Sequence, residues 1–128
     1  MTDTQIPVSP YRCAIGDMSP EEIIRFQIML HCYLNDKKIT KYELDTLTLL
    51  GMTGECELKD FIKKVVEHQI FFTTESSRNS IGRIQKRGFV VKKGGYSKKI
   101  SLNPDMHIQT TGTILVDVKL SNLNYHGS

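Results

Sequence analysis

The sequence has no apolar run long enough to cross a bilayer, and it does not begin with the charged-then-apolar pattern of a signal peptide. It has only three cysteines, Cys13, Cys32 and Cys56, which are widely spaced and form no CxxC pair. An odd number of scattered cysteines argues against a disulfide framework and a zinc site. The four histidines are equally scattered, so we expect no metal site. These absences predict a cytoplasmic protein that does not bind membranes.

The sequence also lacks a recognisable catalytic set. An enzyme needs a nucleophile, a base or a metal gathered in a pocket. His31 and Cys32 fall within an apolar helical stretch, and His68 adjoins Glu67 as an ordinary surface pair would. We therefore expect no catalytic residues, no cofactor and no enzymatic activity.

The 128 residues are 39% hydrophobic and 24% charged, which is typical of one soluble domain. Helical periodicity and capping signals predict four helices, over 19–34, from Thr40 to Gly51, over 56–67 and over 77–87. The first two begin with capping boxes, and the third has a clear apolar stripe.

After the fourth predicted helix the apolar period changes from helical to alternating. Residues 89–102 predict a β-hairpin that turns at Gly94-Gly95, and 114–120 predict a further strand with which 107–109 pair. We expect an α+β fold in three parts: an extended N-terminal arm at 1–18, a domain at 19–103 and a C-terminal β extension at 104–128.

Positive charge is concentrated in one part of the chain. Residues 1–75 contain 8 basic and 12 acidic residues, whereas residues 76–103 contain 8 basic residues and no acidic one. The basic residues of this segment are Arg78, Arg83, Lys86, Arg87, Lys92, Lys93, Lys98 and Lys99. Such segregation indicates a polyanionic partner.

On a helical wheel the fourth predicted helix has two faces. Ser77, Ile81 and Ile84 lie on one side, whereas Asn79, Arg83 and Lys86 lie on the other. Arginine and asparagine suit the edges of guanine and adenine, so we expect Arg83 and Asn79 to contact bases. We expect phosphate contacts from Ser76, Ser77, Lys86, Arg87, Lys92, Lys93, Lys98 and Lys99, and we expect Arg78 to contact the DNA as well.

Residues 76–93 resemble the recognition helix and first wing strand of winged helix-turn-helix regulators. The similarity extends over about 56–103, and the combination also resembles small bacteriophage or prophage proteins. The resemblance implies a winged-helix fold, double-stranded DNA as partner, a role in transcription regulation and a location in a host cytoplasm or virion. Two features depart from the pattern, namely the long connection from Glu67 to Glu75 and Gly82 within the helix.

Other interpretations of the same residues remain. The basic cluster could be a solvated surface, or its wing could hold an acidic protein surface, as in an assembly adaptor of a phage particle. For Phe71, Phe72 and Tyr96 we favour packing in the core or wing over base stacking, and for Tyr33 and Tyr42 packing between helices. The first helix and the β tail are candidates for a homodimer interface.

Overall fold

A computed structural model of the chain describes residues 13–14, 18–96, 98–110 and 115–116. They fall into two compact units, each described here by itself. In the first, β2 (Cys13–Ala14) pairs antiparallel with β6 (Leu115–Val116). The expected pairing of the tail strand with 107–109 is therefore wrong, because 115–116 pair with the N-terminal arm instead. The described part of the chain contains no helix long and apolar enough to cross a membrane.

The second unit, Ser19–Thr111, begins with two helices that start at capping boxes. In α1 (Pro20–Leu34) the Ser19 hydroxyl accepts from the Glu22 N–H, and the Glu22 carboxylate accepts from the Ser19 N–H at 2.9 Å. Thr40 and Glu43 repeat this exchange at the start of α2 (Lys41–Thr53). Each exchange satisfies two backbone donors that the first helical turn leaves unpaired, so both predicted starts are confirmed.

The glycine predicted to end α2 lies inside the helix. The helix continues past Gly51 and ends at Gly54, whose φ of 82° is accessible to glycine. Gly51 instead allows α1 to approach closely, because a Cβ there would lie 2.8 Å from Cγ2 of Ile24.

The third helix begins two residues later than predicted, because the first two residues of the predicted range form a strand. Cys56–Glu57 form β3, and α3 covers Leu58–Glu67. The predicted hairpin is confirmed as β4 (Val90–Lys93) and β5 (Lys99–Leu102), and β5 lies between β3 and β4 in an antiparallel sheet. After β5, Pro104–Met106 form the short 3-10 helix η1. The fourth helix, α4 (Thr74–Lys86), precedes the hairpin.

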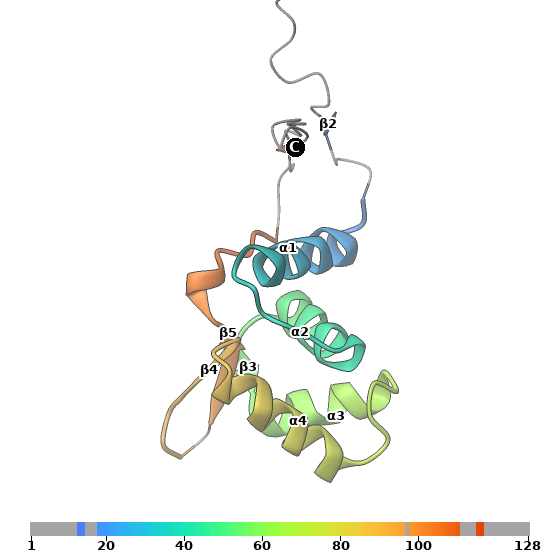
Figure 1. The fold of residues 1–128 in the computed structure, drawn as a ribbon. Coiled ribbons are helices and arrows are strands. Elements are labelled where there is room, and N and C mark those ends of the chain that lie inside the picture. Colours follow the sequence, from blue (N-terminus) through green and yellow to red (C-terminus); the bar gives the residue numbers. More distant parts are fainter. Residues whose placement is uncertain (1–12, 15–17, 97, 111–114, 117–128) are drawn as a thin grey trace, which may run out of the picture. The chain divides into compact units, whose positions relative to one another are not determined.

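The core lies between the four helices and the inner face of the sheet. Figure 1 shows α2 between α1 and the pair formed by α3 and α4, with the hairpin projecting at the side. Burying each large apolar side chain contributes about 1.5–3 kcal/mol before entropy costs. The core side chains that are at most 2% exposed are Ile24, Ile28, Leu47, Leu50, Phe61, Ile62, Val65, Ile81, Ile84, Phe89, Val90 and Ile100. The unit is thus α+β, as expected, with four helices and a small three-stranded antiparallel sheet.

Candidate functional site

The side chains of α4 divide between the core and the surface as the helical wheel predicts. Ser77, Ser80, Ile81 and Ile84 are buried. The exposed residues Arg78, Asn79, Arg83 and Lys86 follow an arc of about 140° at 100° per residue. These four side chains therefore reach solvent from a single helix face. The guanidinium groups of Arg78 and Arg83 lie at its two edges, and the Lys86 ammonium and the Asn79 amide lie between them.

The helix starts earlier than the sequence suggested, and this adds an acidic residue to the face. Thr73 is the N-cap, because its hydroxyl accepts from the Ser76 N–H at 3.0 Å. Glu75 therefore lies in the first turn, one turn before Asn79 on the same exposed face. We expected this helix face to contain no acidic residue, but it has Glu75 at its N-terminal end.

Two of the residues expected to contact nucleic acid have other roles. Ser77 is fully buried and its hydroxyl donates to the Thr73 carbonyl at 2.9 Å, so it does not reach the surface. The Arg87 guanidinium donates to the nearly buried Glu43 carboxylate at 2.9 Å and also to the Lys38 carbonyl. It lies 5.2 Å from the centre of the Phe89 ring. Arg87 thus joins the end of α4 to the start of α2, and we remove both residues from the candidate site.

The lysines of the hairpin do not all point the same way. The ladder places Lys92 opposite Ile100, which is buried, and Lys93 opposite Lys99. Because successive side chains of a strand alternate between faces, Lys92 lies on the core side of the sheet and Lys93 and Lys99 on the other. Lys93 also forms an ion pair with Glu55 at 3.2 Å. Of these three lysines, only Lys92 therefore lies on the side of the sheet that faces the core.

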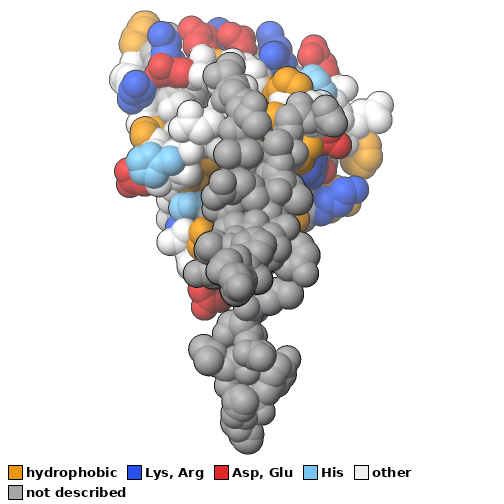
Figure 2. Space-filling view, turned by 90° about the horizontal axis from the view of Figure 1, so that it is seen from above, with side chains coloured by type: hydrophobic (Ala, Val, Ile, Leu, Met, Phe, Trp, Pro, Cys, Tyr) orange, Lys and Arg blue, Asp and Glu red, His pale blue; other side chains and the backbone are white. Residues whose placement is uncertain are grey.

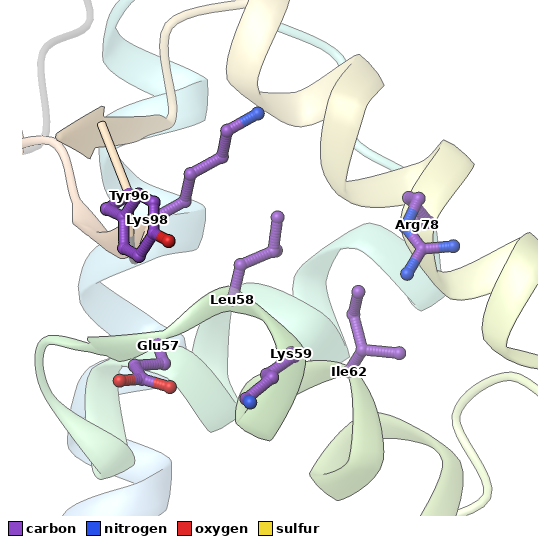
Figure 3. A pocket seen from close by; sticks show the side chains of 7 residues that line it. All are labelled: Glu57, Leu58, Lys59, Ile62, Arg78, Tyr96 and Lys98. Carbon is purple, nitrogen blue, oxygen red and sulfur yellow. The ribbon is translucent and has the colours of Figure 1, made fainter. Parts of the chain in front are cut away.

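A hollow of about 250 Å³ connects α4 to the hairpin. Figure 3 shows Arg78 of α4 and Lys98 of the hairpin on opposite sides of Leu58 and Ile62, which belong to α3. Lys59 from the first turn of α3 also lines the hollow, as do Glu57 and Tyr96. Three cationic side chains and one carboxylate thus line a hollow with the volume to admit a phosphate group.

Lys59 is a candidate that sequence reasoning missed. The apolar stripe of α3 correctly predicts that Lys59 faces outward, but not what it faces. Its place beside the hairpin follows from the pairing of Cys56 with Ile100, and the Leu58 N–H extends this contact by donating to the Lys98 carbonyl at 2.8 Å. No local pattern carried this signal, because the two segments are far apart in the sequence.

Several aromatic side chains are more exposed than we expected. Tyr96 is 104% exposed and Phe72 is 85% exposed, so packing in the core or wing is wrong for both. Phe71 is partly buried against the core, as expected, and its ring centre lies 5.7 Å from that of Tyr42. Tyr96 therefore adds a solvated ring to the edge of the cationic hollow.

The two cysteines of the second unit have the environment of packing residues. Cys32 is buried and Cys56 is half-buried, and neither forms a disulfide. Burial raises the pKa of each thiol, although nearby positive charge (from Arg87 and Lys37 at Cys32, and from Lys64 at Cys56) acts in the opposite direction. A raised pKa lowers the fraction of each thiol that is present as thiolate, the reactive form. The described residues contain no group of three or more potential metal ligands.

Comparisons with known proteins do not assign a family. No protein-family model, curated protein or solved structure matches this chain. Its function is therefore inferred from its own residues and their geometry.

Proposed function

We propose that the chain is a non-enzymatic double-stranded DNA-binding protein, a transcriptional regulator of the winged helix-turn-helix class. The observation that carries this proposal is the exposed face of α4, which presents Arg78, Asn79, Arg83 and Lys86 and of which Arg78 lines a cationic hollow shared with the turn region of the hairpin. In this proposal α4 enters the major groove and the hairpin follows the phosphate backbone.

The order of the elements supports the class. Two consecutive helices, α3 and α4, are followed directly by the β4–β5 hairpin, and β3 completes the sheet. A helix pair followed by a hairpin is what a winged helix-turn-helix requires. The connection between the helices, residues 68–73, is longer than the three- or four-residue turn of a compact motif. Its first half is well anchored, because the Ile70 N–H donates to the Val65 carbonyl and the Ile70 side chain packs on the core.

The proposed contacts divide into two kinds. Asn79 projects from within the α4 face and Arg83 from one edge of it, and bidentate pairing of either side chain with a base edge discriminates by about 1–3 kcal/mol. The phosphate contacts are assigned to the other cationic side chains of α4, the hollow and the hairpin, namely Lys59, Arg78, Lys86, Lys92 and Lys98. If each neutralises one phosphate, log K falls with log salt at a slope of about −4.5, a loss of roughly 500-fold between 50 and 200 mM salt.

Binding of the full chain to a randomised duplex library at 50 and 200 mM salt tests the proposal. Arg83→Ala should weaken the preferred sequences about 10- to 100-fold and flatten the sequence preference. Lys98→Ala should weaken all sequences alike and make the slope less steep by about one. Lys64→Ala is the matched control, because this lysine lies among α1 and α2 residues in a different hollow. It should bind as the parent does.

The same experiment also tests the adaptor interpretation. A chain that stays folded but does not retain duplex DNA even at 50 mM salt would contradict the DNA-binding proposal. The basic face would then be a docking surface for an acidic protein. Equal effects of Lys64→Ala and Lys98→Ala would instead show that only net charge matters and that the assigned face is wrong.

A further inference from the structure

A row of large apolar side chains is exposed along α1. Met29 is 51% exposed, Leu30 43%, Tyr33 82% and Leu34 70%. At 100° per residue these four surround the half-buried Phe26, on the side of the helix opposite the core residues Ile24 and Ile28. An α-helix with one apolar side in the core and a second apolar side in solvent indicates a further packing partner.

We propose that this row on α1 is a self-association surface, through which two copies of the chain pack α1 against α1 in antiparallel orientation. This inference does not depend on DNA binding. It rests on the size of the row, on a hollow beside it and on the charges at its two ends.

The size of the row fits the centre of a dimer interface. Taking a fully exposed side chain of this kind as ~200 Å², the four exposed fractions amount to roughly 500 Å² of apolar surface. The largest apolar patch on a typical monomer is about 300–600 Å² and is often functional, so the row has the size of such a patch. A stable interface buries about 800 Å² on each partner, so the row supplies the apolar centre and its polar neighbours the rim.

The patch contains both a protruding side chain and a hollow. Tyr33 is the most exposed of the four, and a hollow of about 210 Å³ lies beside the row. The residues that line the hollow are Gln27, Leu30, His31, Leu34, Asn35, Met106 and His107. In a two-fold contact the same patch serves both copies, so each Tyr33 can fill the hollow of the other.

The charges at the ends of α1 favour a second copy over an unrelated partner. Glu22 lies in the first turn on the side of the row, whereas Asp36, Lys37 and Lys38 follow the last turn with a net charge of +1. Glu21 instead lies 3.9 Å from Arg25 on the α2 side, and the Lys37 ammonium lies over the Phe89 ring. An antiparallel pair places the acidic start of each helix near the basic end of the other, and it also opposes the two helix dipoles favourably. The patch is therefore complementary to itself.

Pairing through α1 also leaves the proposed DNA-binding face accessible. α2 lies between α1 and α4, so the two surfaces are on different sides of the unit (Figure 1). Seen from above in Figure 2, hydrophobic, acidic and basic side chains of the described residues are interspersed at the surface.

Sedimentation velocity of the full chain from 1 to 100 µM tests the inference. The parent should shift from monomer to dimer within this range, whereas Leu34→Glu should remain monomeric at 100 µM. Phe72→Ser is the matched control, because this side chain is as exposed as Tyr33 but lies on the connection between α3 and α4. It should dimerise as the parent does.

A second variant separates association from folding. Glu22→Gln removes the charge at the end of the row but keeps a side chain that can close the capping box. It should weaken the dimer several-fold without changing the thermal midpoint of the monomer. A parent chain that is monomeric at 100 µM, or a dimer that Leu34→Glu leaves intact, would overturn the inference, whether or not the chain binds DNA.

Discussion

Arg87→Ala separates the structural role of a basic residue from a role in binding. The sequence places Arg87 among the expected phosphate contacts, but its guanidinium donates to Glu43, on α2, and to the Lys38 carbonyl just before that helix. The side chain of Glu43 is only 9% exposed. Removing Arg87 leaves this carboxylate with the N–H of Thr40 as its remaining described partner, at 3.0 Å.

The expected cost follows from the burial of the pair. Breaking a fully buried ion pair costs about 3–5 kcal/mol. The Arg87 side chain is 38% exposed and the Thr40 N–H keeps its bond to Glu43, so we expect about 2 kcal/mol. In a domain of this size that corresponds to a fall of about 8–16 °C in the thermal midpoint.

Thermal unfolding followed by circular dichroism measures this effect, and a double-mutant cycle with Glu43→Gln isolates the pair. Glutamine at position 43 can still close the capping box, so the coupling energy of about 1–2 kcal/mol reports the contact with Arg87. Arg83→Ala, on the exposed face of the same helix, should change stability by less than about 0.5 kcal/mol. If Arg87→Ala melts with the parent yet loses duplex affinity, Arg87 is a binding residue and the reasoning is refuted.

Three further predictions concern stability. Ser80→Ala should stabilise the chain by about 1 kcal/mol in urea unfolding, because the buried Ser80 hydroxyl has no hydrogen-bond partner among the described residues; a loss of stability would indicate a bond to this hydroxyl. Gly82→Ala should also stabilise the chain by about 1 kcal/mol, since a Cβ at this position meets nothing within 4 Å. Gly51→Ala should instead destabilise the chain by about 1 kcal/mol, because a Cβ at this position would lie 2.8 Å from Ile24. The same sign for both glycine variants would contradict the close approach of α1 and α2. Burial, with the nearby positive charge of Lys37, lowers the pKa of His31 below its ordinary value of 6.5. The unfolded chain therefore binds a proton first as the pH falls, so the stability that neutral His31 contributes is present above about pH 6.5 and is lost below it. His31→Gln should flatten the decline of the thermal midpoint between pH 7 and 5.5, and an unchanged decline would contradict this assignment.

Local signals in the sequence predicted the parts of the fold that local interactions determine. The capping boxes at Ser19 and Thr40 mark the starts of α1 and α2, because each bond lies within four residues. The alternation around Gly94-Gly95 gave the hairpin, and helical spacing separated the buried from the exposed side of α4. These features need no information from distant segments.

The remaining features depend on contacts between distant segments. A two-residue strand such as β3 exists only because β5 pairs with it, and no window centred on 56–57 reveals that partner. The pairing of Arg87 with Glu43 and the place of Lys59 beside Lys98 likewise require the packed helices. For Tyr33 the sequence predicted a contact that the single chain does not make. Its helical spacing predicted packing between helices, yet its exposed fraction is 82%.

We propose that α4 and the cationic side chains beside it bind a DNA duplex. The most direct measurement is the affinity of the intact chain for duplex DNA as salt rises from 50 to 200 mM, for the parent and for Lys98→Ala. We expect the affinity of the parent to fall roughly 500-fold and the slope of the variant to be less steep by about one. Undetectable binding at the lowest salt, or identical slopes for the two proteins, would contradict it.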